Sequence, residues 1–343
     1  LTSRYSGEKL SVATERLHQE LETVNALGYE AYFLAVADIV DGARRSGIRV
    51  AARGSGAGSL ICHLLGISGV DPLDHGLLME RFCSTLRTDL PDIDIDVESA
   101  RRLEIYDQVF ARYNPEGSWP HGPVQSTTVA MVETYRARHA IRDAGAALGM
   151  PAMEIDLLAK SMPHIRAGNI EAALSSLPEL KNLNTSAPLT RATIALAARL
   201  DGLPRHLAMH PCAMVLSDAA FLDRAPVQLN AGGFPMVEFD KDDVEDIGLL
   251  KLDILGVRMQ STIAHAVHEI QRVAGEEIDI DALPLDDAAT YSLIQSTRTL
   301  GIFQVESPGQ RELVGKLEPR TFSDLIIDIS LFRPGPVKSD MIR

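Results

Sequence analysis

Apolar and polar residues alternate strictly along residues 90–98, where the sequence reads Leu-Pro-Asp-Ile-Asp-Ile-Asp-Val-Glu. This two-residue period predicts a β-strand with one apolar face and one acidic face. The acidic face carries Asp92, Asp94 and Asp96. Neighbouring carboxylates repel unless a cation lies between them, so the pattern suggests a divalent metal site. A solvated face of an edge strand is the alternative, because acidic residues there block aggregation.

A period of three to four residues predicts helices over much of the remaining chain. The first two are expected over 9–27 and 32–43, with Gly28 and Gly47 as their stops. Later helices are expected over 100–113, 126–148, 154–161, 170–174, 189–200, 263–273, 279–285 and 290–296. Strands are expected over 48–50, 213–216, 236–239, 248–256 and 301–306. The region 126–211 therefore reads as helical, after a Pro- and Gly-rich boundary candidate at 114–123.

A stretch rich in glycine and serine lies at 52–60, directly before an apolar run that predicts a helix. Small residues let backbone amides approach a phosphate, and a following helix adds a favourable dipole. The stretch matches neither a Walker loop nor a dinucleotide fingerprint, and a plain tight loop is the alternative. The residues of interest are Arg53, Gly54, Ser55, Gly56, Gly58 and Ser59.

Lys251 and Asp253 share one face of the strand expected over 248–256, and apolar residues surround them. A surface ion pair is the ordinary interpretation of such a spacing. Charges are costly among apolar residues unless they are paired or used, so this pair is a second candidate for chemistry.

Basic residues gather in the region expected to be helical. Arg136, Arg138 and Arg142 lie on one predicted helix, where contact with DNA or a solvated face are both open interpretations. His206 and His210 are four residues apart. A zinc site is disfavoured because no glutamate follows the first histidine and a proline directly follows the second. Positioning, phosphate contact and an ordinary structural role remain.

Composition narrows the function classes only partly. The chain has 343 residues, is 45% hydrophobic and carries a net charge of −14. The length favours roughly two or three domains. The charge argues against nucleic-acid binding by a generally basic surface, although a local basic channel stays compatible with it.

The chain carries no apolar run long enough for a membrane span and no signal peptide, so no membrane partner is expected. Its three cysteines lack a CxxC spacing and favour a reducing, cytoplasmic setting. The chain begins Leu-Thr-Ser, which we interpret as a piece of a longer polypeptide.

Two carboxylates two residues apart, a third on a distant strand and a glycine- and serine-rich turn are the parts of a nucleotidyl-transfer site. With these parts, the chain resembles the catalytic α subunit of bacterial DNA polymerase III, the C-family polymerases. The motifs that carry the resemblance run in family order: Arg53-Gly-Ser-Gly-Ala-Gly-Ser59, Asp71-Pro-Leu, Glu80-Arg-Phe82, Pro91-Asp-Ile-Asp-Ile-Asp96, Phe239-Asp-Lys-Asp-Asp-Val244, Gly248-Leu-Leu-Lys-Leu-Asp-Ile-Leu-Gly256, Phe303-Gln-Val-Glu-Ser307 and Leu331-Phe-Arg-Pro-Gly-Pro336.

The resemblance implies an α+β fold. Its palm is related to the polymerase-β nucleotidyltransferases, with a mixed sheet and helices. By this mapping the palm covers 1–125 and 207–258, and a helical thumb covers 126–206. The start of a mostly helical fingers domain covers 259–343. The phosphoesterase-like domain, most of the fingers and the clamp-binding regions of the family are absent, so the chain alone can fold without polymerising.

The resemblance also implies roles for single residues. Catalysis and the binding of two Mg²⁺ ions, with Mn²⁺ as a substitute, fall on Asp94, Asp96 and Asp253. Asp92 has no ligand role in the family pattern. The residues implied to bind nucleotide phosphates are Arg53, Gly54, Ser55 and Lys251. Those implied to contact DNA are Arg136, Arg138, Arg142, His206 and His210.

The implied function is template-directed DNA synthesis, in which a primer 3′-hydroxyl takes a nucleotide from a dNTP and pyrophosphate leaves. Expected partners are primer-template DNA and dNTP, together with a sliding clamp and replisome subunits through regions that this chain lacks. The sequences at 206–212 and 306–310 point to the accessory, error-prone branch, which acts in DNA repair. Another metal-dependent nucleotidyltransferase and an inactive DNA-binding fragment are the alternatives.

Overall fold

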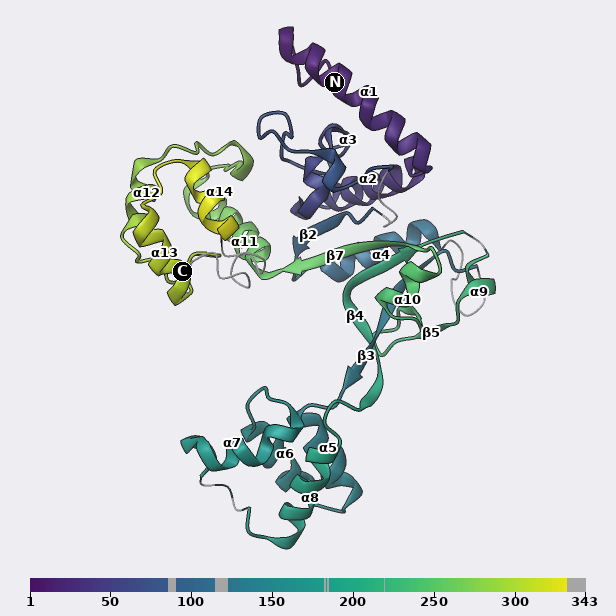
Figure 1. Ribbon diagram of the computed structural model, residues 1–343, viewed down its shortest axis with the longest axis vertical. Helices are drawn as coiled ribbons and strands as arrows, with labels where there is room; N and C mark the ends of the chain where they lie inside the picture. Colours follow the sequence, from purple (N-terminus) through teal and green to yellow (C-terminus); the bar gives the residue numbers. More distant parts are fainter. Residues whose placement is uncertain (86–90, 115–122, 182, 184, 219, 332–343) are drawn as a thin grey trace. The chain divides into compact units, whose positions relative to one another are not determined.

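The computed structural model describes residues 1–85, 91–114, 123–181, 183, 185–218 and 220–331 (Figure 1). The boundary candidate at 114–123 and the motif at 331–336 lie almost wholly outside the described residues. The chain divides into two compact units, Leu1–Gly256 and Val257–Arg343. Among the described helices, none has the length and apolar character needed to cross a membrane.

Ten helices and seven strands are described up to the end of β7. The helices are α1 (Gly7–Leu27), α2 (Glu30–Arg45), α3 (Leu60–Leu64), α4 (Arg102–Tyr113), α5 (Ala137–Ala147), α6 (Ala152–Ser161), α7 (Ile170–Ser176), α8 (Pro188–Arg199), α9 (Phe221–Arg224) and α10 (Lys241–Asp246). The strands are β1 (Val50–Arg53), β2 (Asp94–Glu98), β3 (Ser126–Thr134), β4 (Pro204–Leu216), β5 (Val227–Leu229), β6 (Pro235–Val237) and β7 (Leu250–Val257). Short 3-10 turns include η1 (Gly54–Gly58) and η2 (Met79–Arg81).

The seven strands form one sheet in the order β1-β2-β7-β4-β3-β6-β5. The β3–β6 pair is parallel, whereas β1–β2, β3–β4, β4–β7 and β5–β6 are antiparallel. The sheet is therefore mixed, and helices accompany it, which confirms the expected α+β class. Strands that are far apart in sequence become neighbours here, because β7 lies between β2 and β4.

One face of the sheet is apolar and packs on helices α2 and α4. Strands β2 and β7 contribute Ile95, Val97, Leu252 and Ile254 to this core, and Ile93 joins them from just before β2. Because successive side chains point to opposite faces of a strand, Asp94, Asp96 and Asp253 lie on the other face. The alternation in the sequence thus predicted correctly which side chains of this strand turn away from the core.

The helix expected to start near residue 126 is wrong in its first part. Residues 126–134 form β3, and α5 begins only at Ala137. Ser126 through Ala130 are all buried, on both faces of the strand, so no alternation of polar and apolar residues marks it as a strand. The β-branched Thr127, Thr128 and Val129 were the remaining strand signal. Likewise β4 begins at Pro204, inside the region expected to be helical.

Helices α5 to α8 are inserted between β3 and β4. The pairing of these strands runs from Ser126 opposite Leu216 to Thr134 opposite Pro204, so the chain leaves and re-enters the sheet side by side. Ala140, Ile141, Leu158, Ile170 and Ile194 are part of a separate hydrophobic core among the inserted helices. The helices expected over 154–161, 170–174 and 189–200 are confirmed.

The second unit is helical where it is described. It contains α11 (Arg258–Ala274), α12 (Ala288–Gln295), α13 (Pro308–Leu317) and α14 (Phe322–Leu331). The strand expected over 301–306 is wrong, because positive φ angles at Gly301 and Gln304 break the extended backbone into turns. The helix expected over 279–285 is only a 3-10 turn, η5 (Ile280–Ala282).

Candidate active site

Three carboxylates meet on the polar face of the sheet, where β2 lies beside β7. One oxygen each of Asp92, Asp94 and Asp253 lies within 4.8 Å of the other two. Asp253 is only 9% exposed, and its Oδ1 is buried without a hydrogen-bond partner among the described atoms. The structure thus brings together two of the three expected ligands, Asp94 and Asp253, and adds Asp92, which had no expected ligand role.

Asp96 lies beside this group. Its Oδ2 accepts hydrogen bonds from Arg53 Nε at 3.0 Å and from Arg53 Nη2 at 2.8 Å. Its Oδ1 is buried and has no partner within the described part of the chain. One oxygen of Asp96 is therefore without a partner among the described residues, while the other engages the arginine expected to bind nucleotide.

The carboxylates raise each other's proton affinity. Burial, followed by the charges of Asp92 and Asp253, raises the pKa of Asp94 to about 6. Burial also raises the pKa of Asp92, although the Lys251 ammonium opposes this shift. A group of carboxylates that resist ionisation in this way favours the binding of a cation.

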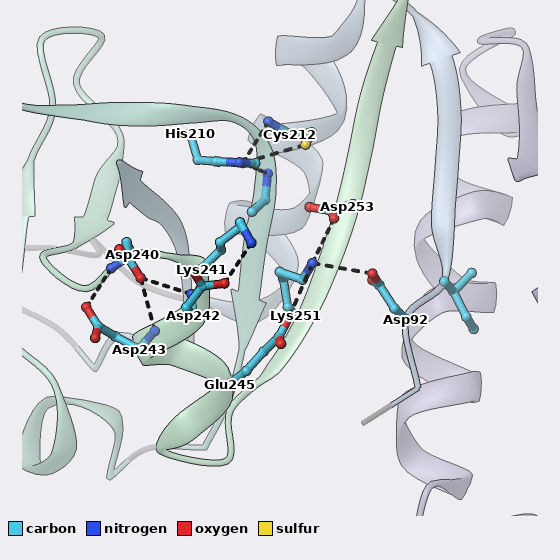
Figure 2. Close-up of polar contacts among 12 residues, drawn as sticks. Asp92, His210, Cys212, Asp240, Lys241, Asp242, Asp243, Glu245, Lys251 and Asp253 are labelled. Carbon is cyan, nitrogen blue, oxygen red and sulfur yellow. Dashed lines mark hydrogen bonds and ion pairs between the residues drawn. The ribbon is translucent and has the colours of Figure 1, made fainter. Parts of the chain in front are cut away.

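Lys251 supplies a cation from within the protein (Figure 2). Its Nζ lies 2.9 Å from Asp253 Oδ2, 3.4 Å from Asp92 Oδ2 and 3.5 Å from Glu245 Oε1. Burial lowers the pKa of Lys251, but these carboxylates outweigh it and the net shift is upward. Sequence reasoning missed Glu245, whose only signal was the acidic run at 240–246.

Tyr32 joins the two strands that carry the site. Its buried hydroxyl donates to the Lys251 carbonyl at 3.3 Å and accepts from the Ile93 amide at 3.0 Å. This residue was also missed, because a tyrosine on an amphipathic helix carries no signal of such a contact.

The glycine-rich stretch reaches the carboxylates at its first glycine. Gly54 has φ +75°, and a Cβ there would lie 3.4 Å from Asp94 Oδ2. A side chain is therefore disfavoured by the backbone conformation, and the 3.4 Å separation shows how closely this glycine approaches the carboxylate. Ser55 follows on the exposed turn η1. Arg53 and Gly54 thus border the acidic group, and Ser55 is the next residue along the turn.

The start of helix α3, after this turn, is already occupied by a protein carboxylate. The amides of Leu60 and Ile61 donate to Glu20 at 3.0 and 3.1 Å, and Ser59 Oγ donates to it at 2.9 Å. Ser59 also accepts from the Cys62 amide. The expected contribution of this helix end to phosphate binding does not fit the structure, which leaves the turn itself as the candidate.

His210 shapes β4 next to Asp253. Pairing with β3 jumps from Met209 to Met214, so the residues between them bulge from the strand. The ring Nδ1 of His210 accepts from the Ala213 amide at 3.0 Å and closes this bulge. Ala213 is in turn paired with Asp253 on β7. His210 is thus placed to hold the strand beside the acidic group.

Cys212 also reaches Asp253 from this bulge. The atoms of His210, Cys212 and Asp253 that could bind a metal lie within 4.8 Å of one another. Burial, followed by the charge of Asp253, raises the pKa of the Cys212 thiol to about 12. A protonated thiol and an imidazole nitrogen that already accepts a backbone hydrogen bond make this a poorer cation site than the carboxylate group. His206 does not belong to this group.

The remaining residues expected to contact DNA lie near or within the inserted helices. Arg136 is exposed, and with Arg138 and His139 it lines a hollow of about 440 Å³. Arg138 Nε donates to the Met162 carbonyl at 2.8 Å. Arg142 pairs with an aspartate of α6 at 2.9 Å.

His206 and His139 both contact Glu133, at 3.1 and 2.7 Å. His206 lies on β4 directly opposite Glu133 on β3. The structure therefore places His206 at the junction of the sheet and the inserted helices, away from the bulge that contains His210.

The donor set fits a hard divalent cation. Asp94 and Asp253 offer carboxylate oxygens within reach of one another, and two buried oxygens, on Asp96 and Asp253, have no protein partner among the described residues. Oxygen-rich sites of this kind suit Mg²⁺ or Mn²⁺.

In comparisons with known proteins, two family models match the chain. Residues 1–256 match the model of the bacterial DNA polymerase III alpha NTPase domain, and residues 259–343 match that of the bacterial DNA polymerase III alpha subunit finger domain. An error-prone DNA polymerase of Alkalilimnicola ehrlichii is 38% identical over 328 residues, which cover 95% of this chain and 31% of the relative.

Two further relatives are also error-prone DNA polymerases. That of Symbiobacterium thermophilum is 38% identical, with 95% of this chain and 29% of the relative covered. That of Pseudomonas aeruginosa is 37% identical, with 100% and 32% covered. The chain thus spans about a third of the length of the curated relatives it matches. With a family model matched over residues 1–256, the chain belongs to the bacterial DNA polymerase III alpha family.

Proposed function

We propose that this chain carries the catalytic centre of a template-directed DNA polymerase of the error-prone branch. The observation that carries the proposal is that Asp94 and Asp253 meet although they come from distant parts of the sequence. Lys251 and Asp92, which contact each other at the same place, are 159 residues apart. Among the described residues, Asp253 and the adjacent Asp96 each have a buried oxygen without a partner. The substrates would be a primer-template DNA and a dNTP. Membership of the family and the names of the relatives support this assignment.

Asp94, Asp96 and Asp253 would hold Mg²⁺, or Mn²⁺ in its place. When bound there, the metal would acidify the primer 3′-hydroxyl and neutralise charge on the leaving pyrophosphate. Arg53 and Lys251 would bind triphosphate oxygens, and the turn that begins at Gly54 would offer backbone amides to them. Positioning and charge stabilisation are thus the contributions of the protein.

The domain division follows the same proposal. The sheet and its helices, 1–125 and 207–258, would form the palm, and residues 126–206 with α5 to α8 would form the thumb. Residues 259–343 would begin the fingers. Arg136, with Arg138, Arg142, His206 and His210, would lie toward the duplex. A sliding clamp and replisome subunits would bind outside this chain.

Primer extension tests the assignment, in a polypeptide of the relatives' full length that includes this chain. Asp94→Asn, Asp96→Asn and Asp253→Asn should each lower kcat by about a hundredfold or more, because each removes a carboxylate that would hold the metal beside the reacting phosphate. Asp246→Asn is the matched control, since Asp246 is an exposed carboxylate on α10. Near-normal extension by all three variants would reject the catalytic assignment. Nucleotide turnover without primer-template would instead indicate another nucleotidyltransferase.

A further inference from the structure

The Lys251 ammonium is held by carboxylates from three separate places in the chain (Figure 2). Asp253 lies two residues further along β7, Asp92 lies two residues before the start of β2, and Glu245 belongs to α10. Their oxygens lie 2.9, 3.4 and 3.5 Å from Nζ. Since Lys251 is only 9% exposed, this is a buried cation with an excess of acidic partners.

The shortest of these contacts uses a carboxylate that the cation site also needs. Asp253 pairs with Lys251 through Oδ2, while its buried Oδ1 has no partner in the described residues. A divalent cation beside Asp253 would repel the ammonium across a short distance, because both are positive. The lysine is therefore an internal competitor for the carboxylate group.

The other two partners differ from Asp253 in their exposure. The Asp253 side chain is 13% exposed, whereas those of Asp92 and Glu245 are 46% and 51% exposed. The exposed carboxylates can move with the ammonium at little packing cost, and the buried one cannot. Of the three carboxylate partners of Lys251, Asp253 is therefore fixed in position, whereas Asp92 and Glu245 can move.

We propose that Asp92 and Glu245 form a holding site that receives the Lys251 ammonium when a divalent cation takes Asp253. The inference rests on the proposed function, because it requires the carboxylates to bind the cation. Asp92 is then a positioning residue that acts through Lys251, although one of its oxygens lies within reach of Asp94 and Asp253. The ammonium stays at the edge of the acidic group, where a triphosphate would approach.

Calorimetric titration of the 343-residue chain with Mn²⁺ alone tests the proposal. Lys251→Met should tighten Mn²⁺ binding by about threefold to tenfold, since a competing charge is removed. Asp92→Asn and Glu245→Gln should each weaken it, because the ammonium then stays on Asp253. For Asp92→Asn we expect about a tenfold loss, the size of coupling found between contacting charges.

The decisive comparison places Asp92→Asn in the Lys251→Met background. If Asp92 acts through the lysine, its substitution should then weaken Mn²⁺ binding by less than about threefold. If Asp92 is a direct metal ligand, the substitution should weaken Mn²⁺ binding as much as it does when Lys251 is present. Asp246→Asn removes the same charge from α10 and serves as the matched control. Lys251→Arg, which keeps the cation, should restore the full effect of Asp92→Asn and guards against a folding defect in the methionine variant.

Two results would overturn the proposal, and they have different meanings. Equal losses from Asp92→Asn with and without Lys251 would make Asp92 a ligand and reject the holding site alone. Failure of the unaltered chain to bind Mn²⁺ would reject the metal site of the proposed function, and the holding site with it.

Discussion

Asp94 is a carboxyl group whose ionisation the folded protein opposes. Burial and the charges of Asp92 and Asp253 raise its pKa to about 6, well above its usual value near 3.8. Between these two pH values the folded chain binds more protons at Asp94 than the unfolded chain does. Stability from this group therefore falls as the pH rises through that window, and the whole loss is present above pH 6.

We expect Asp94→Asn to stabilise the metal-free protein at neutral pH. The melting temperature at pH 7 should rise by about 2 to 4 °C, as for a gain near 1 kcal/mol in a domain of this size. The gain should shrink as the pH falls through 6 and be mostly lost near pH 4, because the folded carboxyl is then neutral and the unfolded one is approaching its own pKa near 3.8. Thermal unfolding in the presence of a chelator between pH 4 and 8 measures this. A difference that does not change with pH would contradict the electrostatic explanation.

The sequence alone predicted the individual carboxylates of the site better than it predicted which of them lie close together. The strict alternation around Asp94 was a local signal, so strand and acidic face could both be predicted. The approach of Asp253 depends on β7 inserting beside β2, which no local pattern encodes. Glu245 lies on a different element again, and only the fold brings it to Lys251.

Helix α1 is fastened to the start of α3 by one buried side chain. Glu20 is 3% exposed and accepts hydrogen bonds from Arg16, Ser59, Leu60 and Ile61. Its removal would leave these donors unpaired beside the glycine-rich turn. The hydrogen bonds of Glu20 therefore couple the surface helix α1 to the segment that borders the candidate site.

We expect Glu20→Ala to lower the free energy of unfolding by about 3 kcal/mol, as for removal of one partner of a buried ion pair. Glu22→Ala, on the exposed face of the same helix, should change it by no more than about 0.5 kcal/mol. Urea unfolding followed by circular dichroism compares the two. Equal effects would show that the contacts of Glu20 do not hold the helix in place.

The basic residues of the inserted helices should contribute unequally to DNA binding. Arg136 is exposed, whereas Arg142 is already paired with Asp156. If Arg136 contacts one phosphate, Arg136→Ala should reduce the slope of log affinity against log salt by about 0.9. Arg142→Ala should leave the slope unchanged. Fluorescence anisotropy with a primer-template duplex over a series of salt concentrations measures both, and an unaltered slope for Arg136→Ala would remove it from the interface.

At the scale of elements, the sequence was informative wherever one face met water. Amphipathic α1 and α2 were predicted near their observed bounds, whereas β2, expected over 90–98, begins only at Asp94, so that Asp92 precedes the strand. Strand β3 was not predicted. Its first residues are buried on both faces, and the apolar residues that follow continue at a helical spacing into α5. The bulge in β4 is likewise invisible locally, since it depends on the His210 ring turning back onto its own strand.

The net charge of −14 has a local meaning in the folded chain. Part of the acidic excess is concentrated around Lys251, and the exposed basic side chain of Arg136 lies directly before the first of the inserted helices. An acidic protein can therefore offer both a cation site and a surface for phosphates. Composition alone could not separate these two regions, because it records amounts and carries no positions.

The two units differ in how much apolar surface each buries within itself. The first unit contains several hydrophobic cores, whereas the described core of the second is formed by Ile294, Val305 and Val314, and α11 has no buried residue. Since local stability follows buried apolar contact, amides of α12 and α13 should exchange with deuterium well before those of β2 and β7. Hydrogen exchange read by mass spectrometry on the whole chain measures this order. Equal protection of both units would mean that the second unit draws stability from contacts beyond its own core.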